Sequence, residues 1–385
     1  MSSAELPKLP ISPRIRKSPF FEATRRWGCQ SYTVYNHMYL PVFYESPEAD
    51  FWHLVKNVTL WDVAVERQVE IKGRDAARLM QYMTPRDLSK MQIGQCRYVL
   101  LCDETGGIVN DPVLLKLADN CFWISLADSD VLLWAKGLAA AGGFDVHVGE
   151  PDVSPLQVQG PHSRDVVHDL FGHWVGELKY FRFRETELDG IPLVVSRTGW
   201  SNELGYEIFL CDGSRGDELW ERIMAAGKPY GIRPGAPSTI RRIEAGLLSY
   251  GADMDLAVDP FELGLERLVA LDLESDCLSL PALKRIAAEG ARREMVGLEI
   301  AGPAMPGNEH PWPVHGANGA VLGKVTSAVY SPRLEKNIAL ALLAKGAVAE
   351  GGAVSIEIPG GPRQATAVPF PFYDPQKELV RAGAA

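Results

Sequence analysis

A tyrosine and an aspartate flank a predicted hairpin in the stretch from Tyr98 to Asp111. Two apolar runs there are joined by "DETGG", and a turn of this composition is typical of β-hairpins. If the turn centres on Thr105 and Gly106, residues whose numbers add to about 211 pair, which places Tyr98 and Asp111 diagonally on one face. A carboxylate in such a place can accept a proton from a reacting group. The alternative is a solvated aspartate at a strand end.

A second carboxylate, Glu207, interrupts an apolar strand. In "GYEIFL" the alternation predicts Tyr206 and Ile208 on one face, and Glu207 with Phe209 on the other. Trp200 precedes this strand, in a loop rich in turn formers. A buried carboxylate can accept two N–H bonds from the edge of a flat heteroaromatic ring, and a tryptophan can pack on that ring. Taken alone, the alternation favours an exposed strand residue.

The stretch "RRIEAGLLSYGADMD" supplies a candidate cation. The pattern "STIRRIEAGLLSYG" predicts a helix with Ser238 as its N-cap. Its apolar face consists of Ile240, Ile243 and Leu247. From this helix the guanidinium of Arg242 can project toward a carboxylate. The alternative is a surface ion pair between Arg241 and Glu244, which stabilises a helix little.

The elements that must position these side chains follow two different secondary-structure patterns along the chain. Residues 68–117 alternate strand, helix and hairpin, and the helix has Ala76, Leu79, Met80 and Met83 at helical spacing. From Ala291 onward, short strands separated by Gly and Pro predict a small all-β barrel or sandwich. We therefore expect an extended arm over residues 1–20, an α/β region over 21–285 and a β-barrel over 286–385. The last residues, "QKELVRAGAA", are expected to fray.

Composition excludes several classes of function. A chain of 385 residues predicts two or three domains, and the net charge of −10 argues against nucleic-acid or anionic-membrane partners. There is no long apolar run and no secretory signal. The six cysteines form no CxxC and the eight histidines no HxxxH, so we expect free thiols in the cytosol and no bound metal. No nucleotide-binding or nucleophile-elbow motif occurs.

These stretches together resemble one known family. The motifs "GGIVND", "QGP", "RTGW…GYEIF", "RIEAGLLSYGADMD", "DPFELGL" and "GKVTSAVYSPRLEKNIALAL" follow the order of the glycine-cleavage T-protein (aminomethyltransferase) family. The resemblance covers nearly the whole chain. It implies an α+β fold with three subdomains, in which two α/β folate-binding subdomains surround a central channel and the third is a C-terminal β-barrel.

The N-terminal third narrows the resemblance. The segments "YTVYNHM", "WDVAVERQVEIKG" and "WISLADSDVLLWAKGL" are similar to the dimethylsulfoniopropionate demethylases, which transfer a methyl group to tetrahydrofolate. Folate-dependent O-demethylases of methoxylated aromatic acids, such as vanillate, syringate and dicamba, belong to the same superfamily.

The resemblance assigns roles to individual residues. Tyr98 and Asp111 match the tyrosine and aspartate that meet the folate near its reactive nitrogen, and both are the implied catalytic residues. Glu207 matches the glutamate that hydrogen-bonds the pterin. Trp200 stands where the family usually has a tyrosine that packs on the cofactor. Arg242 matches a basic residue near the cofactor, with the preceding arginine as its rival.

Three segments depart from the T-protein pattern. The usual Asp-Val-Ser-His-Met reads Asp62-Val63-Ala64-Val65-Glu66, and the usual Asn-Ala-(Ala/Ser)-Asn reads Leu126-Ala127-Asp128-Ser129. The usual Asp-Asp reads Asn110-Asp111. The resemblance places these segments on the substrate side, so we expect a methyl donor other than an aminomethyl-lipoyl arm.

The class of donor sets the chemistry needed on that side. A sulfonium leaves as a neutral thioether and favours aromatic walls, whereas an aryl ether leaves as a phenolate and needs a proton donor. Our substrate-side candidates are His37, Tyr32, Trp123 and Ser129. A structural histidine and core tryptophans are the alternatives.

We therefore predict a cytosolic, tetrahydrofolate-dependent demethylase that is a monomer or homodimer and acts on a small methylated carboxylate. A sulfonium donor is preferred and an aryl methyl ether is the alternative, while an aminomethyltransferase is disfavoured by the departures. A non-enzymatic folate-binding repair or scaffold protein of this fold would carry a "KGC" motif, which the sequence lacks.

Overall fold

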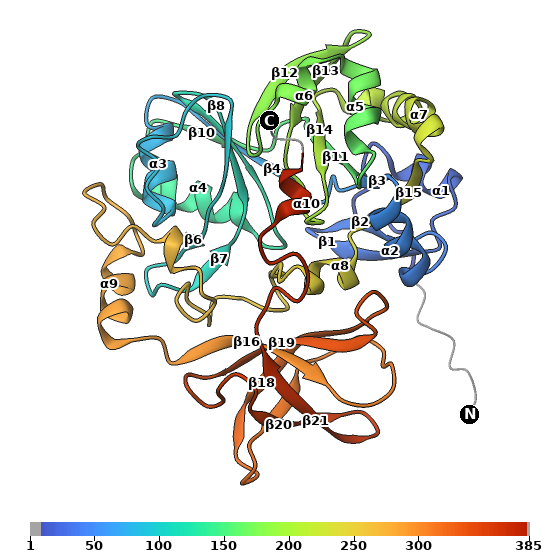
Figure 1. Cartoon of the computed structure of the whole chain (residues 1–385). Helices are drawn as coiled ribbons and strands as arrows, with labels where there is room; N and C mark the ends of the chain where they lie inside the picture. The colour runs from blue at the N-terminus through green and yellow to red at the C-terminus, as the bar shows by residue number, and fades with distance from the viewer. Residues whose placement is uncertain (1–8, 383–385) are drawn as a thin grey trace.

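The computed structural model describes residues 9–382. Two mainly antiparallel sheets stand side by side over a closed β-barrel, and the C-terminal helix lies in the centre between the sheets (Figure 1). The predicted α+β architecture of two α/β parts and a barrel is thus observed. The boundaries predicted between the parts stay a prediction, although the first barrel strand begins at Arg293. No helix in the described range is long and apolar enough to cross a membrane.

The first sheet has five strands in the order β10-β4-β9-β8-β5. They are β10 (His147–Gly149), β4 (Gln68–Lys72), β9 (Cys121–Ser125), β8 (Val113–Ala118) and β5 (Gln95–Tyr98). Helices α3 (Ala76–Met83) and α4 (Val131–Ala141) cover one face. The predicted spacing of α3 is confirmed, because Leu79, Met80 and Met83 are fully buried against this sheet.

The second sheet has six strands in the order β12-β13-β14-β11-β3-β15. They are β12 (Phe183–Leu188), β13 (Ile191–Ser196), β14 (Gly205–Leu210), β11 (Ser154–Gln159), β3 (Thr59–Asp62) and β15 (Arg233–Gly235). Helices α5 (Ser163–Phe171) and α7 (Gly216–Gly227) pack on its outer face. A short helix, α6 (Trp174–Glu177), and turns at Gly213–Arg215 and Lys228–Tyr230 complete this part.

The inner faces of the two sheets pack against each other, so the sheets are buried on both sides. Trp123 of β9 and Phe209 of β14 meet there with ring centroids 6.4 Å apart. All six residues of β14 are buried, including Glu207 on the same face as Phe209. The reading of Glu207 as an exposed strand residue is therefore wrong. An alternating strand is solvated on one face only when nothing covers that face.

The hairpin has the predicted register. Its strands are β6 (Leu101–Cys102) and β7 (Ile108–Asn110), and Leu101 pairs with Asn110. On the adjoining strands Tyr98 pairs with Val113, which leaves Asp111 diagonal to Tyr98.

Helix α8 (Thr239–Glu244) is shorter than predicted. Ser238 is its N-cap, because the Ser238 hydroxyl accepts a hydrogen bond of 3.3 Å from the Arg241 N–H. The helix stops early because Gly246 takes a left-handed conformation with φ +60°. Leu247 consequently lies in the following loop and not on the helix, which corrects the predicted apolar face.

The barrel closes in the order β16-β19-β18-β17-β20-β21. Its strands are β16 (Arg293–Ile300), β17 (Trp312–His315), β18 (Val321–Ser331), β19 (Lys336–Ala344), β20 (Ala353–Ile358) and β21 (Gly361–Val368). Its interior is filled by small and branched apolar side chains, such as Leu298, Val314 and Ile356. Helix α9 (Leu280–Glu289) links it to the sheets, after a turn at Glu266–Leu268.

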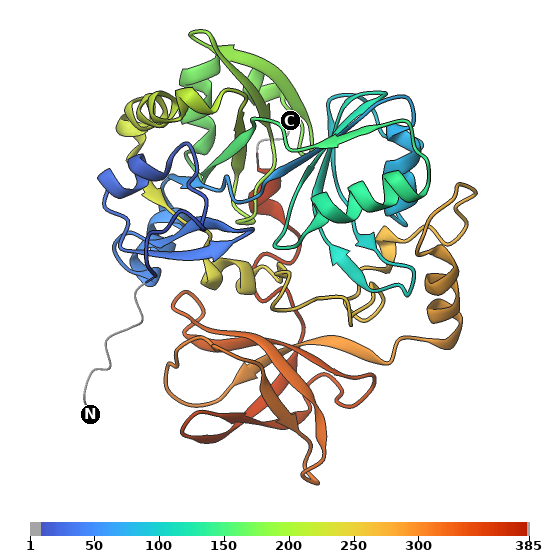
Figure 2. The ribbon, with the colours of Figure 1, turned by 180° about the vertical axis from the view of Figure 1, so that it is seen from behind.

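Both terminal segments pack onto the body of the protein. The expected fraying is wrong for residues 376–382, because they form helix α10 (Glu378–Arg381) and Val380 is buried; residues 383–385 lie outside the described range. Of the arm expected over residues 1–20, residues 1–8 lie outside that range too, and Ser18 and Phe20 are buried. Helices α1 (Phe21–Arg26) and α2 (Pro47–Lys56) and the pair β1 (Ser31–Tyr35) and β2 (Met38–Phe43) lie beside the six-stranded sheet (Figure 2).

Candidate functional site

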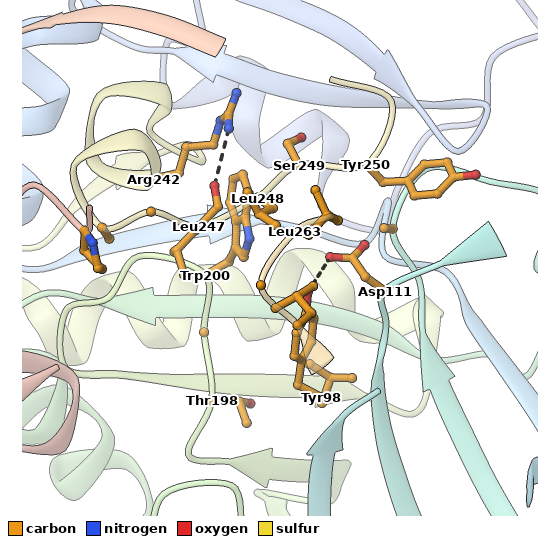
Figure 3. A pocket seen from close by; sticks show the side chains of 18 of the residues that line it. Tyr98, Asp111, Thr198, Trp200, Arg242, Leu247, Leu248, Ser249, Tyr250 and Leu263 are labelled. Carbon is orange, nitrogen blue, oxygen red and sulfur yellow. Dashed lines mark hydrogen bonds between the residues drawn. The ribbon is translucent and has the colours of Figure 1, made fainter. Parts of the chain in front are cut away.

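A cavity of about 1960 Å³ lies where the two sheets, the loop after α8, the C-terminal segment and the barrel meet. Its walls therefore come from segments that are far apart in the sequence (Figures 1 and 3). Tyr98, Asp111, Trp200, Glu207 and Arg242, the residues expected to meet the cofactor, all line it. The structure thus brings this entire predicted set together.

Tyr98 and Asp111 form one side of the cavity (Figure 3). The phenol donates a 3.0 Å hydrogen bond to Oδ2 of Asp111, while Oδ1 is buried and has no hydrogen-bond partner within the described range. Burial raises the pKa of Asp111 to about 7, although the bond from Tyr98 lowers it. Burial, followed by the charge of Asp111, raises the pKa of Tyr98 well above its usual range. Asp111 can therefore exchange a proton near neutral pH, and Tyr98 keeps its own.

Glu207 is held by its neighbours in the sheet. Gln157, its partner across β11 and β14, donates a 2.8 Å hydrogen bond to Oε1, and the hydroxyl of Thr198 donates to Oε2. Burial raises the pKa of Glu207, and these two hydrogen bonds oppose that shift. The carboxylate is thus fixed in orientation, with its remaining lone pairs available to donors in the cavity.

A further carboxylate, Glu66, lies beside Glu207. Glu66 belongs to the connection between β3 and β4, where the chain passes from one sheet to the other. Its Oε1 accepts from Gln157 at 3.2 Å and its Oε2 accepts from Ser125 at 3.0 Å. Burial, followed by the charge of Glu207, raises the pKa of Glu66 well above its usual range.

Arg242 and Trp200 also line the cavity, and Trp200 lies beside Leu247 and Leu248 (Figure 3). Arg242 is paired with Asp253 at 2.9 Å and donates to Ser327 at 2.7 Å, so its charge is compensated within the protein. Its rival Arg241 does not line the cavity and forms a buried ion pair with Glu203 at 2.7 Å. The pair considered between Arg241 and Glu244 is present at 3.7 Å, but both side chains are fully buried, so it is not a surface pair.

The substrate-side candidates lie outside the cavity wall. His37 is exposed and contacts Asp130 at 3.4 Å. Tyr32 bonds to a threonine hydroxyl and packs between aromatic rings, and Trp123 donates to Glu70 at 3.1 Å in the inter-sheet core. Ser129 donates to the Val109 carbonyl at 2.8 Å. These four side chains are thus occupied by structural contacts, and none of them is brought together with the predicted cofactor residues.

Several wall residues were not identified as site residues from the sequence. Glu66 was visible only as a departure from a family motif, and Gln157 and Thr198 only as polar residues in or beside strands. Nothing indicated the basic side chains Lys377 and Arg381, which enter the cavity from the C-terminal segment.

The C-terminal segment adds two basic side chains to the basic residues that other segments contribute to the wall. Arg86, Arg97, Arg267, Lys377 and Arg381 line the cavity, and none makes an ion pair within the described range. Burial, followed by the charges of Arg267 and Arg381, lowers the pKa of Lys377. Uncompensated guanidinium groups suit an anionic ligand group such as a carboxylate.

The segment is anchored at several points. Asp374 accepts from the Glu378 N–H at 2.8 Å and from the Asn202 amide at 3.1 Å. Arg197 donates to the Ala382 carbonyl at 2.9 Å from a buried position, and the Arg333 guanidinium lies 4.1 Å from the centre of the Tyr373 ring. The basic groups are therefore built into the wall.

Comparison with known proteins matches nearly the whole chain to one family. The GCVT N-terminal domain matches residues 20–273, and the glycine cleavage T-protein C-terminal barrel domain matches residues 293–374. The chain is 42% identical to dimethylsulfoniopropionate demethylase DmdA of Ruegeria pomeroyi over 355 residues, covering 92% of this chain and 96% of that protein. It is 30% identical to an aminomethyltransferase of a Thermoanaerobacter species over 366 residues, covering 93% and 98%.

A solved structure shows the same fold. The glycine cleavage system aminomethyltransferase T of Bartonella henselae superposes with a TM-score of 0.84 over 94% of this chain and 98% of its own, at 22% identity. At this level of identity the likeness describes the fold alone, and it confirms the arrangement of sheets and barrel.

Proposed function

Because the chain belongs to the glycine cleavage T-protein family, we propose that it is a tetrahydrofolate-dependent demethylase of a small sulfonium carboxylate such as dimethylsulfoniopropionate. The observation that carries this proposal is the 42% identity to dimethylsulfoniopropionate demethylase, which extends over 92% of the chain. A small-molecule methyl donor agrees with this similarity.

The cavity fits a reduced folate in three respects. Glu207, held in place by the hydrogen bond that Gln157 donates to it, presents a fixed acceptor for the donor edge of a pterin. Oδ1 of Asp111 is a buried acceptor without a partner in the described range, so a ligand N–H can satisfy it. The uncompensated cations Arg267, Lys377 and Arg381 suit the carboxylates at the other end of the molecule. When bound, tetrahydrofolate supplies the ring nitrogen that accepts the methyl group.

The residues of the chain then have separable tasks. The ionised Asp111 takes up the proton that the accepting nitrogen must lose. Its pKa of about 7 makes this exchange possible near neutral pH. Tyr98 orients Asp111 through the 3.0 Å hydrogen bond. Glu207 fixes the position of the pterin, and Trp200 supplies an aromatic wall. Orientation of both partners in line accounts for much of the rate of a group transfer.

The walls also suit a sulfonium donor. Tyr35, Trp200 and Tyr250 give the cavity aromatic faces, which stabilise a cation by cation–π contact. A sulfonium needs no proton donor for its leaving group, and the histidine considered for that role lies outside the cavity. The six cysteines are all free, which agrees with a reaction in the reducing cytosol.

The test is a donor panel. Purified protein is mixed anaerobically with tetrahydrofolate and either dimethylsulfoniopropionate or a methoxybenzoate, and methyltetrahydrofolate is measured by chromatography. We expect product with the sulfonium and none with the methoxybenzoate. Product with the aryl ether alone would move the assignment to an O-demethylase, and no product with either donor would contradict the proposed function.

A further inference from the structure

The second buried carboxylate of the cavity, Glu66, has no role in the reaction described above. We infer that Glu66 is a specificity residue for the reduced pterin, and that it meets the ring as a neutral carboxylic acid beside the ionised Glu207. The inference rests on the proposed function, because it assigns a second reader of the pterin edge in the same cavity.

The first support is geometric. Gln157 places both acids together, since its amide nitrogen donates at 3.2 Å to Oε1 of Glu66 and at 2.8 Å to Oε1 of Glu207. The other oxygen of each acid accepts a hydroxyl, from Ser125 and from Thr198 respectively. Each oxygen thus has one partner in the protein, and both side chains line the cavity. The pair is a preorganised array, since Gln157 and Ser125 belong to strands β11 and β9 and Thr198 follows two residues after β13.

The second support is the charge around the pair. Glu66 and Glu207 form no ion pair within the described range, although seven basic residues line the same cavity. The titratable groups that face the pair are Tyr35 of β1, Cys96 of β5 and Tyr180, all neutral at physiological pH. Behind them, Arg182 acts on Cys96, and Arg381 and Arg197 act on Tyr180, but none of these cations forms an ion pair with either acid within the described range. The remaining neighbours, Gln157 and Ser125, carry no charge. Two buried carboxylates without a cation cannot both be ionised at low energy, so they retain one proton between them.

The third support is the chemistry of the ligand edge. The pyrimidine edge of a pterin presents N3–H and a 2-amino group as donors, then N1 as an acceptor, and in the tetrahydro form N8–H as a further donor. A carboxylate accepts from the two donors, whereas a carboxylic acid donates to N1 and accepts one further N–H. Glu207 as the anion and Glu66 as the acid complement this order. Folic acid has no N8–H, so the Glu66 carbonyl oxygen would face an acceptor there.

The two acids also differ in their surroundings in a way that favours this assignment. Glu207 receives its bond from Gln157 at the shorter distance, and hydrogen bonds from Thr198, Gln157 and Ser196 oppose the rise in its pKa that burial causes. Glu66 feels the charge of Glu207 in addition to its own burial. The shared proton therefore resides mainly on Glu66.

The experiment compares Glu66→Gln, Glu66→Met and the exposed control Glu187→Gln, each checked for a single cooperative melting transition. Dissociation constants of tetrahydrofolate and folic acid are measured by tryptophan fluorescence from about pH 6 to about pH 9. The wild-type affinity should fall by about tenfold once the pH is high enough for Glu66 to lose its proton. Glutamine keeps one donor and one acceptor and cannot titrate, so Glu66→Gln should stay within about threefold of wild type at neutral pH and lose the alkaline fall.

Methionine removes both hydrogen bonds, so Glu66→Met should bind tetrahydrofolate about tenfold more weakly at neutral pH and discriminate less against folic acid. The inference is overturned if Glu66→Met binds both ligands as the wild type does, or if Glu66→Gln retains the alkaline fall. A wild-type protein that neither binds nor demethylates would instead overturn the proposed function, which keeps the two failures distinct.

Discussion

The cavity holds two buried acid sites that differ in how their oxygens are satisfied. At the Tyr98–Asp111 site one carboxylate oxygen accepts a single hydrogen bond and the other has no partner within the described range. At the Glu66–Glu207 site all four oxygens accept hydrogen bonds from the protein. Burial raises the pKa at both sites. A carboxyl group with one oxygen free of hydrogen bonds from the protein is suited to exchange a proton with a ligand. A pair whose oxygens all accept hydrogen bonds from the protein is suited to hold a ligand in one orientation.

The strongest test of this difference is Asp111→Asn. We expect kcat to fall by about a thousandfold with little change in folate affinity, because the variant loses the proton acceptor but keeps the cavity shape. For the wild type, kcat/KM should rise with pH through about 7, since the ionised Asp111 is the active form. Steady-state kinetics over pH give both readouts, and Asp119→Asn on the surface is the control. Loss of affinity without loss of kcat would assign Asp111 to binding.

The matching change at the other site is Glu207→Gln. We expect folate to bind about a hundredfold more weakly, because a charge-assisted acceptor is replaced by an amide that presents a donor to a donor edge. Isothermal titration with tetrahydrofolate measures the change against Glu187→Gln, which alters an exposed glutamate. Unchanged affinity would mean that Glu207 does not bind folate. The proposed difference between a proton-exchanging site and a ligand-holding site would then be contradicted.

A milder change, Tyr98→Phe, separates orientation from proton exchange. The hydrogen bond from Tyr98 lowers the pKa of Asp111, so its removal should move the acidic limb of kcat/KM to higher pH. We expect activity at neutral pH to fall by about tenfold, with folate affinity retained. A fall of the same size at every pH would mean that Tyr98 acts on the donor and not through Asp111.

The smallest effect is on stability. An acid whose pKa is raised on folding holds its proton more tightly in the folded state, so its stabilising contribution is present at low pH and is lost as the pH rises through the folded pKa. For Asp111 this window runs from its ordinary value of 3.8 to about 7, and Glu66 shifts in the same direction. Asp111→Asn and Glu66→Gln should therefore raise the melting temperature by a few degrees at about pH 8 and less at about pH 5, measured by calorimetry.

Local patterns predicted a large part of the fold. The hairpin register that places Asp111 diagonal to Tyr98 followed from the turn residues, and the shared face of Glu207 and Phe209 followed from strand alternation. Both depend on backbone periods that involve only a few neighbouring residues. The end of α8 was missed because Gly246 was read as part of a helix, although its left-handed φ marks the end.

The sequence by itself determined which strands, turns and motifs carry chemistry, because these are set by short-range geometry and by the order of the motifs. Only the tertiary structure decided that Glu207 is buried, since burial of its face depends on the five-stranded sheet packing against it. The same packing brought Glu66 beside Glu207 and excluded His37, and the fold of the C-terminal segment delivered Lys377. A strand period fixes which way a side chain points, but what it meets there depends on segments elsewhere in the chain.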